Sequence, residues 1–127
     1  MTLPTEPSPN PAAAPAGKLP PDSLVALTAD LRAFAAARQW QPFHAPKNLA
    51  MALSVEAAEL LEHFQWLTEA QSRALPEPQR AEVAHEVADV LLYLLQLADQ
   101  LGIDPVQAAR AKMALNAQRF PLPPAGG

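Results

Sequence analysis

The amino-acid sequence contains no cysteine, which excludes disulfide bonds, thiol catalysis and zinc sites with thiolate ligands. Only four glycines are present, and they do not form a glycine-rich phosphate-binding loop. No apolar run approaches the roughly 20 residues that cross a bilayer, and the N-terminus lacks the pattern of a secretory signal. We therefore expect a soluble, cytoplasmic protein with no membrane partner.

Positive charge is also scarce. Nine Lys and Arg residues are scattered among 13 Asp and Glu residues, which gives a net charge of −4. Proteins that bind nucleic acids usually carry a basic patch or stripe. We therefore expect no nucleic-acid partner.

Proline, in contrast, is abundant but unevenly placed. Seven of the 15 prolines lie between Pro4 and Pro21, in a segment with almost no large apolar residues. A segment of this composition cannot bury enough apolar surface to fold. The sequence predicts a disordered leader over residues 1–21, a folded domain over residues 22–120 and a flexible tail over residues 121–127.

The domain is predicted to be all-α, because apolar residues recur at helical spacing and no useful stretch alternates as a strand does. Capping residues and prolines place four helices at about residues 23–39, 47–67, 78–101 and 105–120. We expect these helices to pack as a four-helix bundle. A core of this size, rich in alanine, is modest, and the third helix is apolar almost all round. Both features predict a homo-oligomer, either a dimer or a tetramer.

Two of these helices each carry a pair of carboxylates three residues apart. The pairs are Glu56 with Glu59, and Glu86 with Asp89. Residues at this spacing are neighbours on a helix surface, so each pair directs two oxygen ligands the same way. The second pair belongs to a narrow polar stripe on an otherwise apolar helix, which predicts that the stripe is buried. The stripe consists of Glu82, Glu86, Asp89, Tyr93, Gln96 and Gln100.

Converging acids need a compensating interaction. Two carboxylates about 5 Å apart repel by roughly 3 kcal/mol at an effective dielectric constant near 20. They therefore require a cation or strongly raised pKa values. The alternative is that the acids are solvated, with Glu59 and Glu62 at the edge of the water. Two such pairs on successive apolar helices favour a metal site over this alternative.

Other candidate functional residues are more ambiguous. Glu82 and His85 match the Glu-x-x-His element of di-iron bundles, but that site requires two copies and the sequence has one. Lys112, Asn116 and Arg119 share one face of the last helix. That face could bind phosphate oxygens, or it could simply be a solvated surface.

Three motifs follow one another along the chain: FHAPKNLAMALSVEAAELLEHFQW from Phe43, EVADVLLYLLQLADQLGID from Glu86, and KMALNAQRFP from Lys112. Together they resemble the MazG-like all-α nucleoside triphosphate pyrophosphohydrolases, and most of all the members that cleave dCTP. The resemblance covers about residues 24–121. It implies a helical-bundle dimer that pairs into a tetramer, and cleavage of a triphosphate to a monophosphate and pyrophosphate.

The resemblance also implies roles for individual residues. The Mg²⁺ ligands are Glu56, Glu59, Glu86 and Asp89. Of these, Glu59 or Glu56 is the candidate for orienting the attacking water in catalysis. Further positions match those near the nucleotide in the family: Trp40, His44, Lys47, Trp66, Tyr93, Lys112, Asn116 and Arg119.

Two positions depart from the family pattern. His85 stands where relatives usually carry another acid, and Leu31 lies where dCTP-specific relatives can offer a polar side chain near the base. The sequence therefore predicts a magnesium-dependent pyrophosphohydrolase of the nucleotide pool, acting on dCTP or a 5-modified dCTP. The alternatives are the same chemistry on another nucleotide and a catalytically silent helical module for oligomerisation or binding.

Overall fold

The computed structural model describes residue 20 and residues 23–125, and this part of the chain contains helices but no strand. The all-α prediction is thus confirmed for these residues. The expectation for the leader falls on residues that lie outside the described ones, apart from Pro20. In the predicted tail, residues 121–125 form no helix. The helices are α1 (Leu24–Ala37), the 3₁₀ turn η2 (Gln41–Phe43), α2 (Pro46–Glu62), α3 (Glu69–Arg73), α4 (Gln79–Gln100) and α5 (Pro105–Arg119).

Side-chain caps begin two of the long helices where the sequence predicts them. The Ser23 hydroxyl accepts a hydrogen bond from the Ala26 N–H at 3.0 Å and begins α1. The Asp104 carboxylate accepts hydrogen bonds from the N–H groups of Val106 and Gln107 and begins α5. These caps satisfy N–H groups that have no partner inside the helix.

A glycine closes the C-terminal end of helix α4. Gly102 has a φ of +66°, a left-handed conformation that residues with a Cβ rarely adopt. The following N–H, that of Ile103, donates to the Ala98 carbonyl at 2.8 Å, which closes the helix in the manner of a Schellman motif. The chain therefore changes direction here, between α4 and α5.

Two details of the segment between α2 and α4 differ from the prediction. Helix α2 ends at Glu62 rather than near residue 67, because the N–H groups of His63 and Phe64 bond to carbonyls three residues back and tighten the chain. The segment predicted to be a loop also contains the short helix α3. It begins at a capping box, in which Thr68 and Gln71 each bond to the other's backbone N–H.

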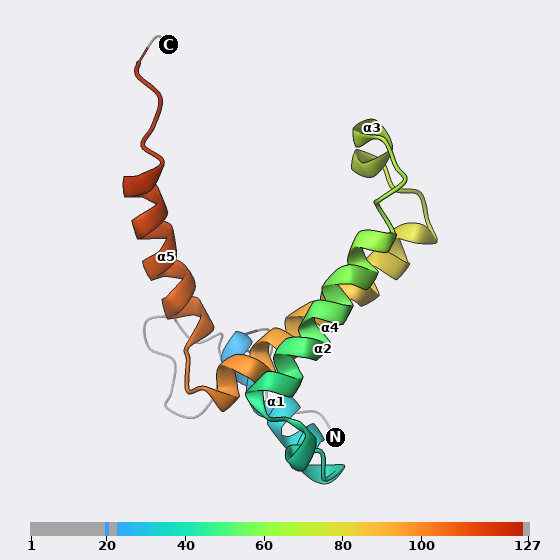
Figure 1. The fold of residues 1–127 in the computed structure, drawn as a ribbon, viewed down its shortest axis with the longest axis vertical. Coiled ribbons are helices and arrows are strands. Elements are labelled where there is room, and N and C mark those ends of the chain that lie inside the picture. Colours follow the sequence, from blue (N-terminus) through green and yellow to red (C-terminus); the bar gives the residue numbers. More distant parts are fainter. Residues whose placement is uncertain (1–19, 21–22, 126–127) are drawn as a thin grey trace, which may run out of the picture.

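The centre of the molecule is the pair α2 and α4, which run antiparallel and side by side, with α1 against the C-terminal part of α4 (Figure 1). Leu49 of α2 and Leu95 of α4 are each only 1% exposed. Ala35 of α1 and Ala98 of α4 complete the buried apolar set. The core is therefore small, and most of it depends on one long helix, α4.

A charged pair also joins α1 to α4. The Arg32 guanidinium donates two hydrogen bonds to the Asp99 carboxylate, at 3.0 Å from Nε and 2.6 Å from Nη2. These bonds hold the pKa of Asp99 below its usual value. Because the pair is largely exposed, it fixes the position of α1 more than it stabilises the fold.

Helix α5 does not pack extensively on any other helix, and Figure 1 shows it pointing away from the α2–α4 pair. The expectation of a four-helix bundle is therefore wrong for the single chain: α1, α2 and α4 pack together and the fourth long helix stands apart. Its apolar side chains are exposed as a result, with Met113 at 70% and Leu115 at 58%. None of the helices in the described part of the chain is long and apolar enough to cross a membrane.

The small core leads to a first prediction. Leu49→Ala or Leu95→Ala should each lower the free energy of unfolding by about 2–5 kcal/mol, because each removes a buried side chain and leaves a cavity. Urea denaturation followed by circular dichroism measures this loss. Leu122→Ala is the control, since Leu122 is 93% exposed and its truncation should change little. Equal stability of all three variants would contradict this description of the core.

Candidate functional site

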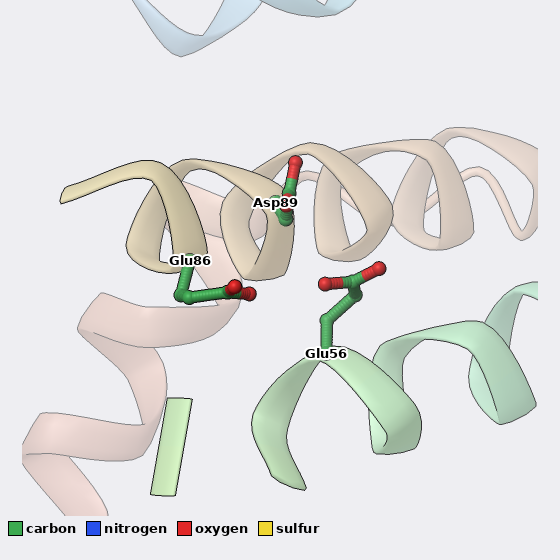
Figure 2. Close-up of side chains that lie close together, drawn as sticks. All are labelled: Glu56, Glu86 and Asp89. Carbon is green, nitrogen blue, oxygen red and sulfur yellow. The ribbon is translucent and has the colours of Figure 1, made fainter. Parts of the chain in front are cut away.

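Three carboxylates from the two central helices lie close together (Figure 2). Glu56 projects from α2 towards α4, while Glu86 and Asp89 come from successive turns of α4. One oxygen from each residue lies within 4.8 Å of the other two. The close packing of α2 against α4 thus brings together acids that are about 30 residues apart in the sequence.

These acids have buried oxygens without partners. The Oε2 atoms of Glu56 and Glu86 are both buried and accept no hydrogen bond. Burial, then a hydrogen bond to Glu59, then the charges of Glu59, Asp89 and Glu86 raise the pKa of Glu56 to about 7. Near neutral pH the cluster therefore requires either a proton or a cation.

The ligand set suits a hard divalent cation. Carboxylate oxygens are the ligands that Mg²⁺ prefers, and Mg²⁺ usually takes only one or two carboxylates directly while keeping several waters. Three converging carboxylates, two of them with a buried oxygen that has no partner, meet this requirement. Glu59, the fourth predicted ligand, is half-buried beside Glu56 but lies outside this three-residue cluster.

A histidine that the sequence analysis did not assign lies next to the acids. The His63 ring is 3.9 Å from Glu86, measured from Nε2 to Oε1, and 4.0 Å from Glu82, measured from Nδ1 to Oε2. His63 follows Glu56 and Glu59 at helical spacing, and this regularity was a signal available in the sequence. His63 therefore brings its ring nitrogens to the edge of the carboxylate cluster.

A pocket of about 390 Å³ opens beside the acid cluster. It lies between α1, the turn η2 and α4, and Asp89 lines it and so connects it with the acids. Three of the predicted nucleotide-binding residues line it as well: Trp40, His44 and Tyr93. The volume falls within the range of small-molecule sites in proteins.

The wall of this pocket on the side of η2 is aromatic. The rings of Phe34 and Trp40 meet edge to face, with centroids 5.6 Å apart. The rings of Trp40 and His44 are 6.1 Å apart and tilted. Phe43 lines the pocket too and is 70% exposed. Planar aromatic surfaces of this kind can stack on a planar ligand.

Five of the predicted substrate residues do not line this pocket. Lys47 lies exposed in the first turn of α2, and Trp66 is 87% exposed in the turns that follow α2. The other three are on α5, away from the central helices: Lys112, Asn116 and Arg119. One chain alone thus brings together the acids and the aromatic wall, but not these five residues.

Two residues that the sequence analysis left without a role also line the pocket. Leu31 lies on its wall and offers no hydrogen-bonding side chain there. Gln96 lines the pocket from α4, and its Oε1 atom is buried with no hydrogen-bond partner. Its place on the polar stripe of α4 was visible in the sequence, but the pocket that it faces was not.

Comparison with known proteins defines the class. The MazG-like family matches residues 51–126, which is more than half of the chain. The chain therefore belongs to the MazG-like family. A pyrophosphatase from Archaeoglobus fulgidus, known from a crystal structure, is 43% identical and superimposes with a TM-score of 0.72, over 76% of this chain and 90% of that one.

The curated relatives carry more specific names. Mouse dCTP pyrophosphatase 1 is 46% identical over 91 residues, which cover 70% of this chain and 54% of the relative. Human dCTP pyrophosphatase 1 is 43% identical over 94 residues, or 69% and 53% of the two chains. A dATP/dGTP diphosphohydrolase of cyanophage S-2L is 52% identical over 40 residues, or 32% and 38%. This chain spans about half the length of the mouse and human relatives.

The raised pKa of Glu56 leads to a second prediction, for the metal-free protein. The pKa of Glu56 is raised from 4.5 to about 7 in the folded state, so the folded protein holds this proton more tightly than the unfolded chain does. The resulting stabilisation is fully present below pH 4.5 and is lost as the pH rises through 7. Glu56→Gln should remove this dependence, so the thermal midpoint of the variant should exceed that of the wild type increasingly above pH 5. Thermal melts in EDTA from pH 4.5 to pH 8 measure the difference.

Glu62→Gln is the matched control for these melts. Glu62 lies in the last turn of α2 and is exposed, so this variant should follow the wild type at every pH. Parallel curves for the wild type and Glu56→Gln would show that Glu56 does not carry the uncompensated charge.

Proposed function

We propose that this protein is a magnesium-dependent pyrophosphohydrolase that converts a deoxynucleoside triphosphate to its monophosphate and pyrophosphate. The observation that carries the proposal is that Asp89 belongs both to the acid cluster and to the aromatic pocket. A ligand with its phosphates at the cluster can therefore place its base in the pocket. The names of the pyrophosphatase relatives support the same reaction.

Each group of the acid site then has a role in this reaction. Glu56, Glu86 and Asp89 would hold Mg²⁺. When bound, the ion supplies charge neutralisation for the triphosphate and a lowered pKa for a nearby water. Glu59, half-buried beside Glu56, is placed to accept the proton of the attacking water as general base.

The pocket residues position the rest of the nucleotide. Trp40 and His44 offer ring surfaces for the base, and Tyr93 lines the same pocket one helical turn from Asp89. We propose that the substrates are pyrimidine triphosphates, with dCTP and its 5-substituted forms first. The cyanophage relative, named as acting on purine triphosphates, makes dATP and dGTP the necessary comparison.

A catalytically silent binding module is the alternative from another class. Such a module would keep half-buried carboxylates, two of which have a buried oxygen without a partner, and these destabilise a fold that does not use them. The acid cluster therefore favours an enzyme over a silent module.

We also propose that the protein acts as a homo-oligomer, a dimer or a tetramer. Helix α5 leaves Met113 and Leu115 largely exposed, and α4 exposes Val87 (51%) and Leu94 (44%). Exposed apolar surface of this extent is typical of subunit interfaces. Packing α5 of one subunit on the central helices of another would cover these side chains and bring a polar face to the site, that of Lys112, Asn116 and Arg119.

A third prediction tests the reaction. With Mg²⁺ and dCTP, the wild type should release pyrophosphate, while Glu56→Gln and Asp89→Asn should lower kcat by at least about 100-fold without unfolding the protein. Coupled detection of pyrophosphate measures the rate, and Glu62→Gln is again the control. Full activity of both acid variants would contradict the site. Release of orthophosphate in place of pyrophosphate would contradict the reaction class.

A fourth prediction tests the assembly. At micromolar concentration the wild type should sediment as a dimer or tetramer, and Leu115→Glu should yield a smaller species because a charge would enter an apolar contact. Gln107→Glu adds the same charge on an exposed residue of α5 and should leave the assembly unchanged. Analytical ultracentrifugation distinguishes the species, and a monomeric wild type would refute the proposal.

A further inference from the structure

Gln96 has an unusual environment for an uncharged polar residue. Three side-chain oxygens in the described part of the chain are buried without a hydrogen-bond partner, and two of them belong to Glu56 and Glu86 of the acid cluster. The third is Oε1 of Gln96. A buried amide oxygen without a donor destabilises the free protein. A bound molecule that donates a hydrogen bond to this oxygen would relieve the cost.

The pocket around Gln96 offers that partner a place. Gln96 lines the pocket together with Leu31, Phe34 and Leu92, whose side chains carry no hydrogen-bond donor. A ligand that enters between these apolar groups can therefore supply the missing N–H. His44, Asp89 and Tyr93 line the same pocket, so Gln96 is one of a small number of polar groups that can fix the orientation of a bound ligand.

The position of Gln96 along α4 matches the length of a nucleotide. Gln96 follows Asp89 by seven residues, which is two helical turns or about 10 Å along the axis on the same face. A sugar and a phosphate can span this distance. A nucleotide with its phosphates at the acid cluster thus places the hydrogen-bonding edge of its base near Gln96.

We infer that Gln96 determines base specificity by recognising an amino edge, as in cytosine. Its Oε1 atom accepts a hydrogen bond from the exocyclic amine, and its Nε2 group donates to the neighbouring ring nitrogen. Glutamine forms this kind of paired contact with adenine, which also presents an amine beside a ring nitrogen. Uracil and thymine present a carbonyl and a ring N–H at the same edge. In this orientation of the Gln96 amide, the two acceptors would face each other, and so would the two donors. This inference rests on the proposed function and specifies its substrate.

Within one chain, the other residues considered for base recognition are less suitable. Leu31 has no polar atom, and Asn116 is on α5, away from the pocket. His44 lines the pocket but lies next to Trp40 at its aromatic wall. Gln96 is the pocket side chain with a buried, unpaired atom.

The test compares two substrates that differ only at this edge, dCTP and dUTP. The wild type should favour dCTP in kcat/KM by at least about tenfold, because a mismatched buried polar group is left unpaired. Gln96→Met keeps the length of the side chain but removes its polar atoms, and it should reduce the preference to about threefold or less. Gln100→Met is the control on the same helix and should keep the wild-type preference. A preference that survives in Gln96→Met, or a wild type that favours dUTP or neither substrate, would overturn the inference.

A second measurement separates this inference from the proposed function. Calorimetric titration of dCMP and dUMP without Mg²⁺ reports on the base site alone and does not require hydrolysis. If no triphosphate is cleaved, yet the wild type binds dCMP more tightly than dUMP and Gln96→Met does not, then the proposed function fails and the role of Gln96 holds. If triphosphates are cleaved but neither monophosphate is preferred, the role of Gln96 fails and the reaction stands. Absence of binding by both monophosphates also overturns the role of Gln96.

Thermal stability separates a binding role from a structural one. If Gln96 serves the ligand, Gln96→Met removes an unpaired buried oxygen, and the free protein should melt at the same temperature as the wild type or higher. A structural role predicts a clear loss of stability instead. A fall in the melting temperature with an unchanged dCTP-to-dUTP ratio would assign Gln96 to the fold and overturn the inference.

Discussion

Repulsion among the half-buried carboxylates of the acid cluster is the constraint on which the rest of this structure depends. Glu56, Glu86 and Asp89 are held within a few ångströms of one another because apolar residues such as Leu49 and Leu95 pack α2 against α4. The hydrophobic contact is favourable and the charge contact is not, and both are located in the same helix pair. A cation bound at this cluster would remove the conflict and stabilise the central helices.

One helix organises both halves of the site. Helix α4 carries two acids of the cluster, then Tyr93 one turn further and Gln96 one turn beyond that, all on one face. In the proposed binding mode, a nucleotide would meet α4 with its phosphates near Asp89, its sugar near Tyr93 and its base near Gln96. Helix α1 and the turn η2 close the other side of the pocket with Phe34 and Trp40, and the Arg32–Asp99 pair fixes α1 in place. The pocket thus depends on a wall that is joined to α4 by few contacts.

The sequence predicts the local features well and the long-range ones less so. Ser23, Gly102 and Asp104 end or begin helices through interactions with their immediate neighbours, and a pattern of residues reveals such signals. The capping box of α3 was also readable but was missed. The pairing of acids followed from helical spacing and composition. The pocket around Gln96 did not, because it needs residues from α1, η2 and α4 brought together by folding. The sequence did not reveal that α5 stands apart from the other helices, because periodicity identifies an apolar face but not what covers it.

Helix α5 has a consequence for how the protein would behave at low abundance. The chain turns away at Gly102, and the polar face with Lys112 and Arg119 leaves the neighbourhood of the acids that belong to the same molecule. In the proposed assembly these cations come from another copy, so a dissociated subunit keeps its carboxylates but loses its phosphate-binding partners. The rate per molecule would then fall on dilution, and two inactive subunits with different defects could restore a working site when mixed.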